Sequence, residues 1–128
     1  MYHHTAPISS FYALYGALRI VLEEGLDACI ARHQKNHEYL RDGLEKLGFE
    51  YIVAPEYRIP HLNAVRLPPG LEDLASRRRL LNEYNIEIGG GLGDFAGKVW
   101  RIGLMGCSSS QNHVNLLLAA LENLIKTK

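Results

Sequence analysis

The sequence lacks the features that mark several large classes of protein. Its 128 residues include only two cysteines, Cys29 and Cys107, and its 14 Lys and Arg side chains balance 14 Asp and Glu side chains. A chain without net charge has no general attraction to nucleic acid or to an anionic membrane, so we expect neither as a partner. No apolar run approaches the roughly 18 residues that a membrane-spanning helix needs. Two distant cysteines, without a signal peptide or a disulfide-rich pattern, indicate reduced thiols in an intracellular, soluble protein.

Motifs for nucleotides and metals are also missing. The sequence has no Gly-x-x-x-x-Gly-Lys-Ser/Thr loop, and the glycines that begin at Gly89 lack the third glycine and the following helix of a dinucleotide-binding motif. His3 and His4 are adjacent and therefore point apart, while His33 and His37 have helical spacing but no third ligand or nearby glutamate. We expect no metal site, and we predict that His33 and His37 are partly buried, hydrogen-bonded histidines.

One stretch, residues 89–106, joins a glycine-rich loop to a short apolar strand that carries an arginine. Glycines let a backbone take positive φ and let its N–H groups approach a ligand closely. The alternation after the loop predicts a strand with Val99, Arg101 and Gly103 on one face and Trp100, Ile102 and Leu104 on the other. A guanidinium held on a strand is a rigid two-pronged donor for a carboxylate or a phosphate. The spacing alone equally allows Arg101 to point into solvent or to pair with Glu87.

Hydrophobic spacing predicts an α+β domain with a small, mainly antiparallel sheet and helices packed on one face. The expected helices cover residues 9–24, 26–47 and 72–84 and a last stretch after Ser110, and the expected strands cover residues 49–53, 61–67, 85–88 and 98–105. Ser9 or Ser10 is the expected N-cap of the first helix, and Gly25 its stop. The run Arg77 to Arg79 is expected on a solvated helix face.

Two motifs, one at residues 1–7 and one formed by residues 86–93 and 97–107, resemble one family of enzymes. Residues 86–93 read Ile-Glu-Ile-Gly-Gly-Gly-Leu-Gly, residues 97–107 read Gly-Lys-Val-Trp-Arg-Ile-Gly-Leu-Met-Gly-Cys, and residues 1–7 read Met-Tyr-His-His-Thr-Ala-Pro. In their order along the chain, these residues resemble the C-terminal part of alanine–glyoxylate and serine–pyruvate aminotransferases, which are class V pyridoxal-phosphate enzymes. The resemblance covers essentially the whole chain. It implies transfer of an amino group from a small amino acid, alanine or serine, to glyoxylate or another small 2-oxo acid.

The resemblance also implies roles for individual residues. Arg101 would bind the α-carboxylate of the substrate, and the glycine loop with Gly91 would shape a pocket for a small side chain. Tyr2 and Thr5 would reach across a homodimer interface and hydrogen-bond the cofactor phosphate of the other subunit. Residues 1–24 would be a connector segment and helix, and residues 25–128 the small C-terminal domain. Relatives of this kind work in the cytosol, mitochondria and peroxisomes, and we expect a cytoplasmic location.

The chemistry of transamination needs more than this chain contains. By the resemblance, the lysine that binds pyridoxal 5'-phosphate covalently, its acidic partner and its stacking residue belong to a large N-terminal domain that is absent here. We therefore expect the 128-residue chain alone to be inactive. Two alternatives stay open: a stand-alone interaction or dimerisation module that acts through its first helix, and a small anion-binding protein that uses the glycine loop and Arg101 without chemistry.

Overall fold

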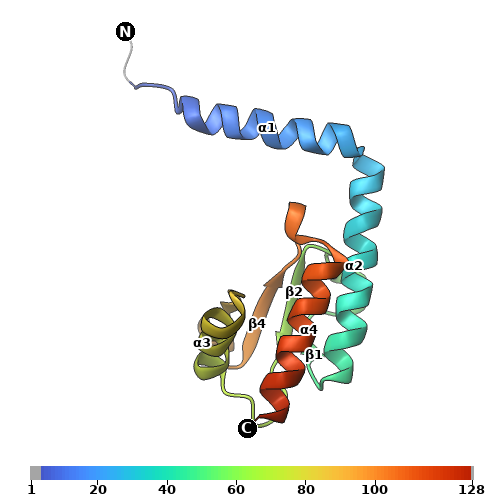
Figure 1. Ribbon diagram of the computed structural model, residues 1–128, viewed down its shortest axis with the longest axis vertical. Helices are drawn as coiled ribbons and strands as arrows, with labels where there is room; N and C mark the ends of the chain where they lie inside the picture. The colour runs from blue at the N-terminus through green and yellow to red at the C-terminus, as the bar shows by residue number, and fades with distance from the viewer. Residues whose placement is uncertain (1–3, 128) are drawn as a thin grey trace. The chain divides into compact units, whose positions relative to one another are not determined.

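The structure, a computed structural model, describes residues 4–127 (Figure 1). The chain divides into two units, one that ends at Ala31 and one that begins at Arg32. Tyr2, a predicted cofactor-binding residue, lies outside the described residues. His3, which was expected not to bind a metal, lies outside them as well. No helix among the described residues is both long enough and apolar enough to cross a bilayer.

The first unit contains helix α1 (Ile8–Glu24) and the beginning of helix α2 (Leu26–Lys46). Helix α1 has no buried residue, and apolar side chains such as Phe11, Leu14 and Leu18 are each more than half exposed. Gly25, with φ of 87°, separates the two helices as predicted, because this left-handed conformation suits glycine. The predicted serine cap is wrong: Ser9 and Ser10 lie inside α1, whose N-cap is Pro7, without a side-chain cap.

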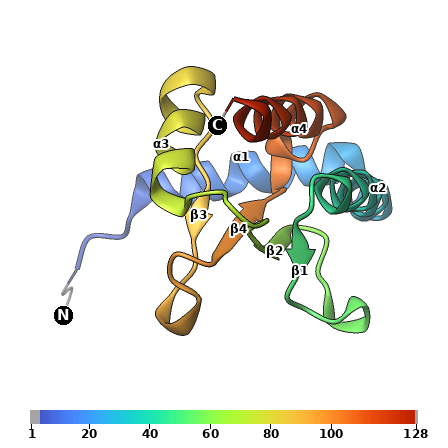
Figure 2. The same cartoon turned by 90° about the horizontal axis from the view of Figure 1, so that it is seen from below.

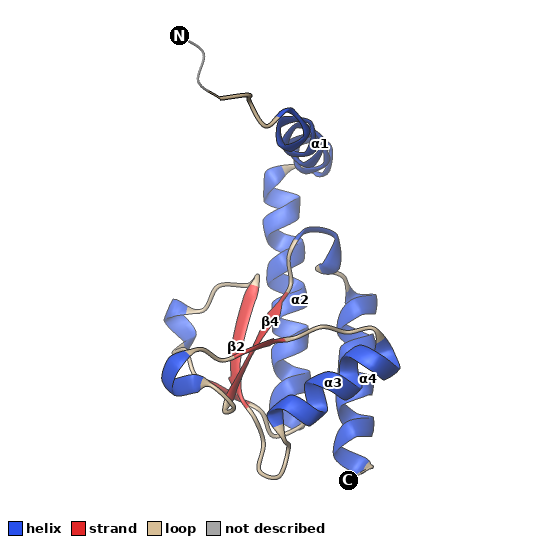
Figure 3. Cartoon of the chain, turned by 90° about the vertical axis from the view of Figure 1, so that its left-hand side faces the viewer, coloured by secondary structure: helices blue, strands red, loops and turns tan. Residues whose placement is uncertain are grey.

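The second unit is built on a four-stranded antiparallel sheet. Its strands are β1 (Glu50–Tyr51), β2 (Leu62–Arg66), β3 (Gly89–Gly90) and β4 (Val99–Gly103), in the order β1-β2-β4-β3. Its helices are the rest of α2, α3 (Asp73–Tyr84) and α4 (Gln111–Lys126). Figure 2 shows α2, α3 and α4 on the same side of the sheet, and Figure 3 shows the paired strands β2 and β4 in red. The predicted α+β fold with helices on one face is confirmed.

The core lies between the sheet and these helices. Trp100, Ile102 and Leu104 point from β4 and the residues after it into the core, as the alternation predicted, whereas Arg101 and Gly103 are exposed on the opposite face. The helices contribute the buried apolar residues Leu40, Leu44, Leu80, Val114, Leu117, Leu121 and Leu124. Ser110 caps α4, since its side chain accepts a hydrogen bond from the His113 backbone N–H. Val99, expected on the face of Arg101, is buried, so the alternation fails at the start of β4. One face of the sheet is thus packed, and the other is open at Arg101 and Gly103.

Two strand predictions needed correction. The strand expected at residues 85–88 is not formed, because Asn85 takes the left-handed conformation (φ 55°) and Ile86 donates its backbone N–H to Leu80 in the last turn of α3. The chain reaches the sheet only at Gly89. The strand expected at residues 49–53 is limited to Glu50–Tyr51.

Candidate functional site

The open face of the sheet displays Arg101 at its centre. In the strand register Arg101 lies opposite Ala64 of β2 on one side and Gly89 of β3 on the other. Both neighbours are small, since one has a methyl group and the other no side chain, so neither covers the guanidinium. Arg101 is exposed on the face opposite the helices. The guanidinium of Arg101 is thus flanked on the sheet surface by small residues.

One atom of the Arg101 guanidinium is already fixed by the chain. Nε donates a hydrogen bond to the carbonyl oxygen of Gly90 at 2.9 Å. No carboxylate among residues 4–127 forms a salt bridge with Arg101, so pairing with Glu87 is not what the structure shows. With Nε held by the backbone, Nη1 and Nη2 remain for the two oxygens of a carboxylate, which is the fork geometry that arginine provides.

The glycine loop next to Arg101 folds back on itself. Gly91 is half-buried, and a Cβ at this position would lie 2.1 Å from the carbonyl oxygen of Phe95, a distance that no side chain tolerates. Phe95 belongs to a short 3-10 turn, Gly93–Phe95, in which Gly93 has φ of 55°. Position 91 therefore requires glycine because of the close approach of the turn. The structure places Gly91 one residue beyond Gly90, the residue that holds Arg101.

Helix α3 supports the loop from the side of the core. Arg77 forms a two-pronged ion pair with Asp73, at 2.6 Å from Nε to Oδ1 and 3.1 Å from Nη2 to Oδ2. The indole N–H of Trp100 donates to the same Asp73 Oδ1 at 2.8 Å. These bonds, first that of Arg77, lower the pKa of Asp73 and keep it ionised. Arg77 is half-buried, so its predicted place on a solvated face is wrong, although Arg78 is exposed.

Asp73 and Arg77 were missed at the level of sequence. Their spacing of four residues on a helix is the one available signal, and it is shared by Arg79 and Glu83 on the same helix. Only the fold shows which pair faces the strands. The sequence likewise did not indicate which of the consecutive glycines 89–91 would bind Arg101.

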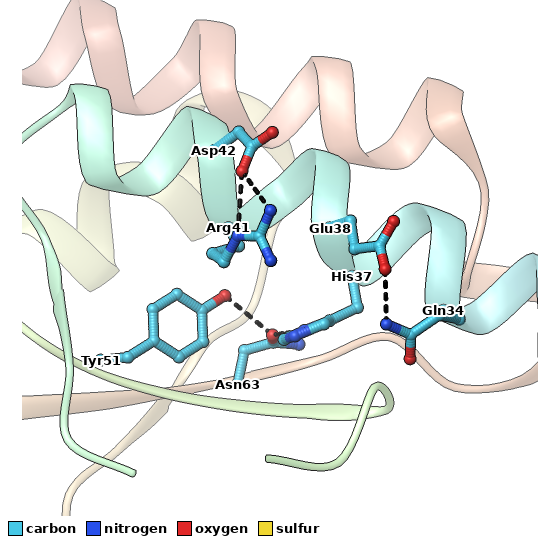
Figure 4. Close-up of polar contacts among 7 residues, drawn as sticks. All are labelled: Gln34, His37, Glu38, Arg41, Asp42, Tyr51 and Asn63. Carbon is cyan, nitrogen blue, oxygen red and sulfur yellow. Dashed lines mark hydrogen bonds and ion pairs between the residues drawn. The ribbon is translucent and has the colours of Figure 1, made fainter. Parts of the chain in front are cut away.

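A buried polar cluster lies under β2 (Figure 4). Asn63 is fully buried, and its Oδ1 lies 2.7 Å from Nδ1 of His37 and accepts from the Tyr51 hydroxyl at 2.9 Å. Its Nδ2 donates to the carbonyl of Ile102 at 3.3 Å, next to Arg101 in β4. Burial raises the pKa of Tyr51. The prediction of a buried, hydrogen-bonded histidine is confirmed for His37, which joins α2 to β2 through Asn63.

Helix α2 also fixes the chain that follows β4. Arg32 donates to the carbonyls of Gly106 and Ser109 at 3.0 and 2.6 Å, and Asn36 donates to the Ser109 carbonyl at 2.8 Å. His33 is half-buried on the same helix. No group of three or more metal-capable side chains occurs within residues 4–127. Side chains of α2 therefore hold the backbone of residues 106–109.

The described residues offer little of a site for an organic cofactor. Thr5 is exposed, and its hydroxyl suits a contact with a phosphate. All lysines between residues 4 and 127 are exposed, with Lys98 donating to the Asp94 carbonyl and Lys126 paired with Glu122. A lysine that binds a cofactor covalently needs a desolvated or charge-tuned setting, and no lysine in this part of the chain has one.

In sequence and in fold, the chain is similar to known aminotransferases. The chain is 39% identical over 129 residues to an alanine–glyoxylate aminotransferase of Callithrix jacchus and 37% identical over 120 residues to an (S)-ureidoglycine–glyoxylate transaminase of Bacillus subtilis. These matches cover 98% and 94% of this chain. A crystal structure of alanine–glyoxylate aminotransferase from Nostoc sp. superposes with a TM-score of 0.91 at 54% identity. No protein-family profile matches the chain.

The matched proteins are much longer than this chain. It spans 31% of the Callithrix jacchus protein, 29% of the Bacillus subtilis protein and 33% of the Nostoc chain. The superposition on the Nostoc structure includes 98% of the present chain. The similarity therefore concerns about one third of each relative.

Proposed function

We propose, on the premise that this chain belongs to the class V aminotransferases and corresponds to their C-terminal part, that it forms the substrate-facing small domain of a transaminase. The complete enzyme would move an amino group from a small amino acid, alanine or serine, to glyoxylate or another small 2-oxo acid. The names of the relatives support this class of reaction. The large domain that they contain would supply the rest of the active site.

The observation that carries the proposal is the state of Arg101. Its Nε is fixed on Gly90, its side chain is exposed on the open face, and no carboxylate of the described residues pairs with it. Such a group can bind the α-carboxylate of the substrate in two-pronged fashion, which contributes about 1.5–3 kcal/mol for hydrogen bonds to a charged group. Holding the carboxylate also orients the Cα–H bond for proton removal.

The surroundings of Arg101 favour a small substrate. Ala64, Gly89 and Gly103 line the open face beside it, and the Met105 side chain approaches Gly103. The loop at Gly91 is fixed by its contact with Phe95 and cannot widen easily. We propose that this tight, weakly polar surrounding selects the side chains of alanine, serine or glyoxylate.

Pyridoxal 5'-phosphate is the proposed cofactor of the complete enzyme, in which it would act as the electron sink for the reaction. From this chain, Thr5 and Tyr2 would donate hydroxyl hydrogen bonds to its phosphate in the other subunit of a homodimer. Residues 1–24 would connect the two domains, and residues 25–128 would form the small domain. The 128-residue chain alone would be inactive, because none of its described lysines lies in a suitable setting.

Steady-state kinetics of the complete enzyme test the role of Arg101. Arg101→Ala is expected to raise KM for the amino acid by at least about 30-fold, which corresponds to about 2 kcal/mol of lost binding. The cofactor absorbance should be unchanged. Arg66→Ala is the matched control, since Arg66 is an exposed arginine on the same sheet, opposite Val99 rather than Gly89. Loss of cofactor with an unchanged KM in Arg101→Ala would reject the assignment.

A second candidate is supported by the apolar surface of α1. Phe11, Tyr12 and Leu18 are exposed on a helix that has no buried residue, and such surfaces mark sites of association. A stand-alone interaction or dimerisation module would use this helix. It is distinguished from the transaminase domain by the mass of the polypeptide in its source cell, which is near 14.4 kDa for the module and about three times larger for the enzyme.

A further inference from the structure

Gly90 lies between two guanidinium groups. Its carbonyl oxygen accepts the hydrogen bond from Arg101 Nε at 2.9 Å. On the side where a Cβ would stand, Gly90 faces Arg77: such a Cβ would lie 3.1 Å from Nη2 and 3.3 Å from Cζ of Arg77. The planar guanidinium of Arg77 therefore packs directly on the Gly90 backbone. Arg77 thus contacts Gly90 on one side, and the carbonyl of Gly90 binds Arg101 on the other.

Arg77 is itself held in place by buried or partly buried partners. Its side chain is 26% exposed and that of Asp73 is 15% exposed, and two hydrogen bonds join them. Asp73 Oδ1 also accepts from Nε1 of Trp100, which is fully buried and pairs with Gly90 across the two strands. Because Trp100 cannot move without opening the core, Asp73 and Arg77 are tied to a rigid point. The chain of contacts then runs from Trp100 through Asp73, Arg77 and Gly90 to Arg101.

We propose that Asp73 and Arg77 are positioning residues for Arg101: they fix the Gly90 carbonyl, which fixes the guanidinium that binds the substrate carboxylate. The proposal rests on the function proposed above for Arg101. It adds a specific reason for the two-pronged ion pair on α3, whose residues contact Trp100 and Gly90. Without it, Gly90 would be held only by its strand pairing with Trp100, and the Gly90 carbonyl would fix Arg101 less firmly. Pre-orientation of such a group is worth a large part of its effect on rate.

Helix α3 contains its own matched control. Arg79 and Glu83 form the same kind of pair four residues apart, at 2.9 and 3.3 Å, but both are more than one third exposed. Arg79 reaches toward Thr127 at the end of the chain, away from the strands. Arg79→Met removes one such ion pair from the same helix, and it therefore reports what the loss of a helical ion pair does by itself.

The first experiment follows the Arg101 Nε–H in the 128-residue chain by nitrogen-15 NMR, with Arg101→Lys to assign the signal. In Arg77→Met we expect this hydrogen to exchange with water at least about threefold faster, because the opening of its hydrogen bond becomes easier. In Arg79→Met the rate should stay at the wild-type value. An equal rate in Arg77→Met and wild type would overturn the proposal. Trp100 fluorescence shows whether each variant keeps its core.

Gly90→Ala provides an independent variant that leaves the ion pair chemically intact. The new methyl group would press on Arg77 at 3.1 Å, so Gly90 or Arg77 must shift by a few tenths of an ångström. We expect faster exchange at Arg101 in this variant as well. If Arg77→Met does not fold, Gly90→Ala decides: an unchanged exchange rate would overturn the proposal.

The second experiment is a double-mutant cycle in the complete enzyme. Arg77→Met is expected to raise KM for the amino acid about tenfold with little change in cofactor content, since misplacement of a binding group is costly. In the Arg101→Ala background the same change should have no further effect, because residues that act through one another are not additive. An additive effect would overturn the positioning role. If Arg101→Ala itself leaves KM unchanged, the proposed function fails, while the NMR result still decides whether Arg77 positions Arg101.

Discussion

Replacing Asn63 by alanine tests how the strand that carries Arg101 is held in the sheet. Asn63 is fully buried on β2 and uses both ends of its amide: Oδ1 meets His37 at 2.7 Å and Tyr51 at 2.9 Å, and Nδ2 donates to the carbonyl of Ile102 at 3.3 Å. Asn63 also pairs with Ile102 in the strand register. One side chain thus joins α2, β1, β2 and β4.

The expected cost follows from these contacts. Asn63→Ala leaves the buried His37 Nδ1–H and the half-buried Tyr51 hydroxyl without their acceptor, and each unsatisfied group costs up to about 1–3 kcal/mol. The longer bonds to carbonyl groups add less. We expect the free energy of unfolding to fall by about 3–5 kcal/mol. Tyr51→Phe is the matched variant, because Asn63 keeps His37 as a partner, and it should cost only about 1 kcal/mol.

Urea unfolding followed by tryptophan fluorescence measures both values. Trp100 is the one tryptophan of the sequence and is buried in the second unit, so its emission reports that unit without a contribution from α1. Equal losses in Asn63→Ala and Tyr51→Phe, or a loss below about 1 kcal/mol in Asn63→Ala, would refute the view that this cluster joins the strands.

Two further predictions concern the surroundings of Arg101. Arg77 lowers the pKa of Asp73, so the ionised Asp73 stabilises the fold above its unfolded pKa of about 3.9. This contribution to the free energy of unfolding is lost as the pH falls through the lower folded pKa. Asp73→Asn should therefore make the free energy of unfolding less dependent on pH below about pH 4, and an unchanged pH dependence would contradict this prediction. Gly91→Ala would place a methyl group 2.1 Å from the Phe95 carbonyl, so the turn at residues 93–95 must move; we expect the complete enzyme to lose at least about tenfold in kcat/KM, whereas Gly93→Asn, which tolerates positive φ, should lose much less. An equal loss in both glycine variants would show that the close approach at Gly91 has no special effect.

The parts of the fold that could be predicted are those set by local spacing. The apolar positions of α4 and the alternation of β4 depend on one helix or one strand, and both were placed correctly on the buried side. The strand expected at residues 85–88 failed because a left-handed Asn85 and two hydrogen bonds to the end of α3 compete with strand pairing. Propensity alone does not measure that competition.

The site shows the same division. Arg101 was identified by its place on a strand after a glycine loop, and its role came from the resemblance to a family rather than from spacing. Arg77 was expected on a solvated helix face, yet tertiary packing brings it onto Gly90. Contacts between Asp73 and Trp100, 27 residues apart, depend on how α3 lies on the sheet. Such long-range contacts leave no periodic trace in the sequence.

The measurement that tests the central claim most directly is a crystal structure of the complete enzyme with a bound small 2-oxo acid. The account predicts both carboxylate oxygens within hydrogen-bond distance of Nη1 and Nη2 of Arg101, with Nε still on the Gly90 carbonyl. A carboxylate bound to another cation, with Arg101 turned into solvent, would contradict it.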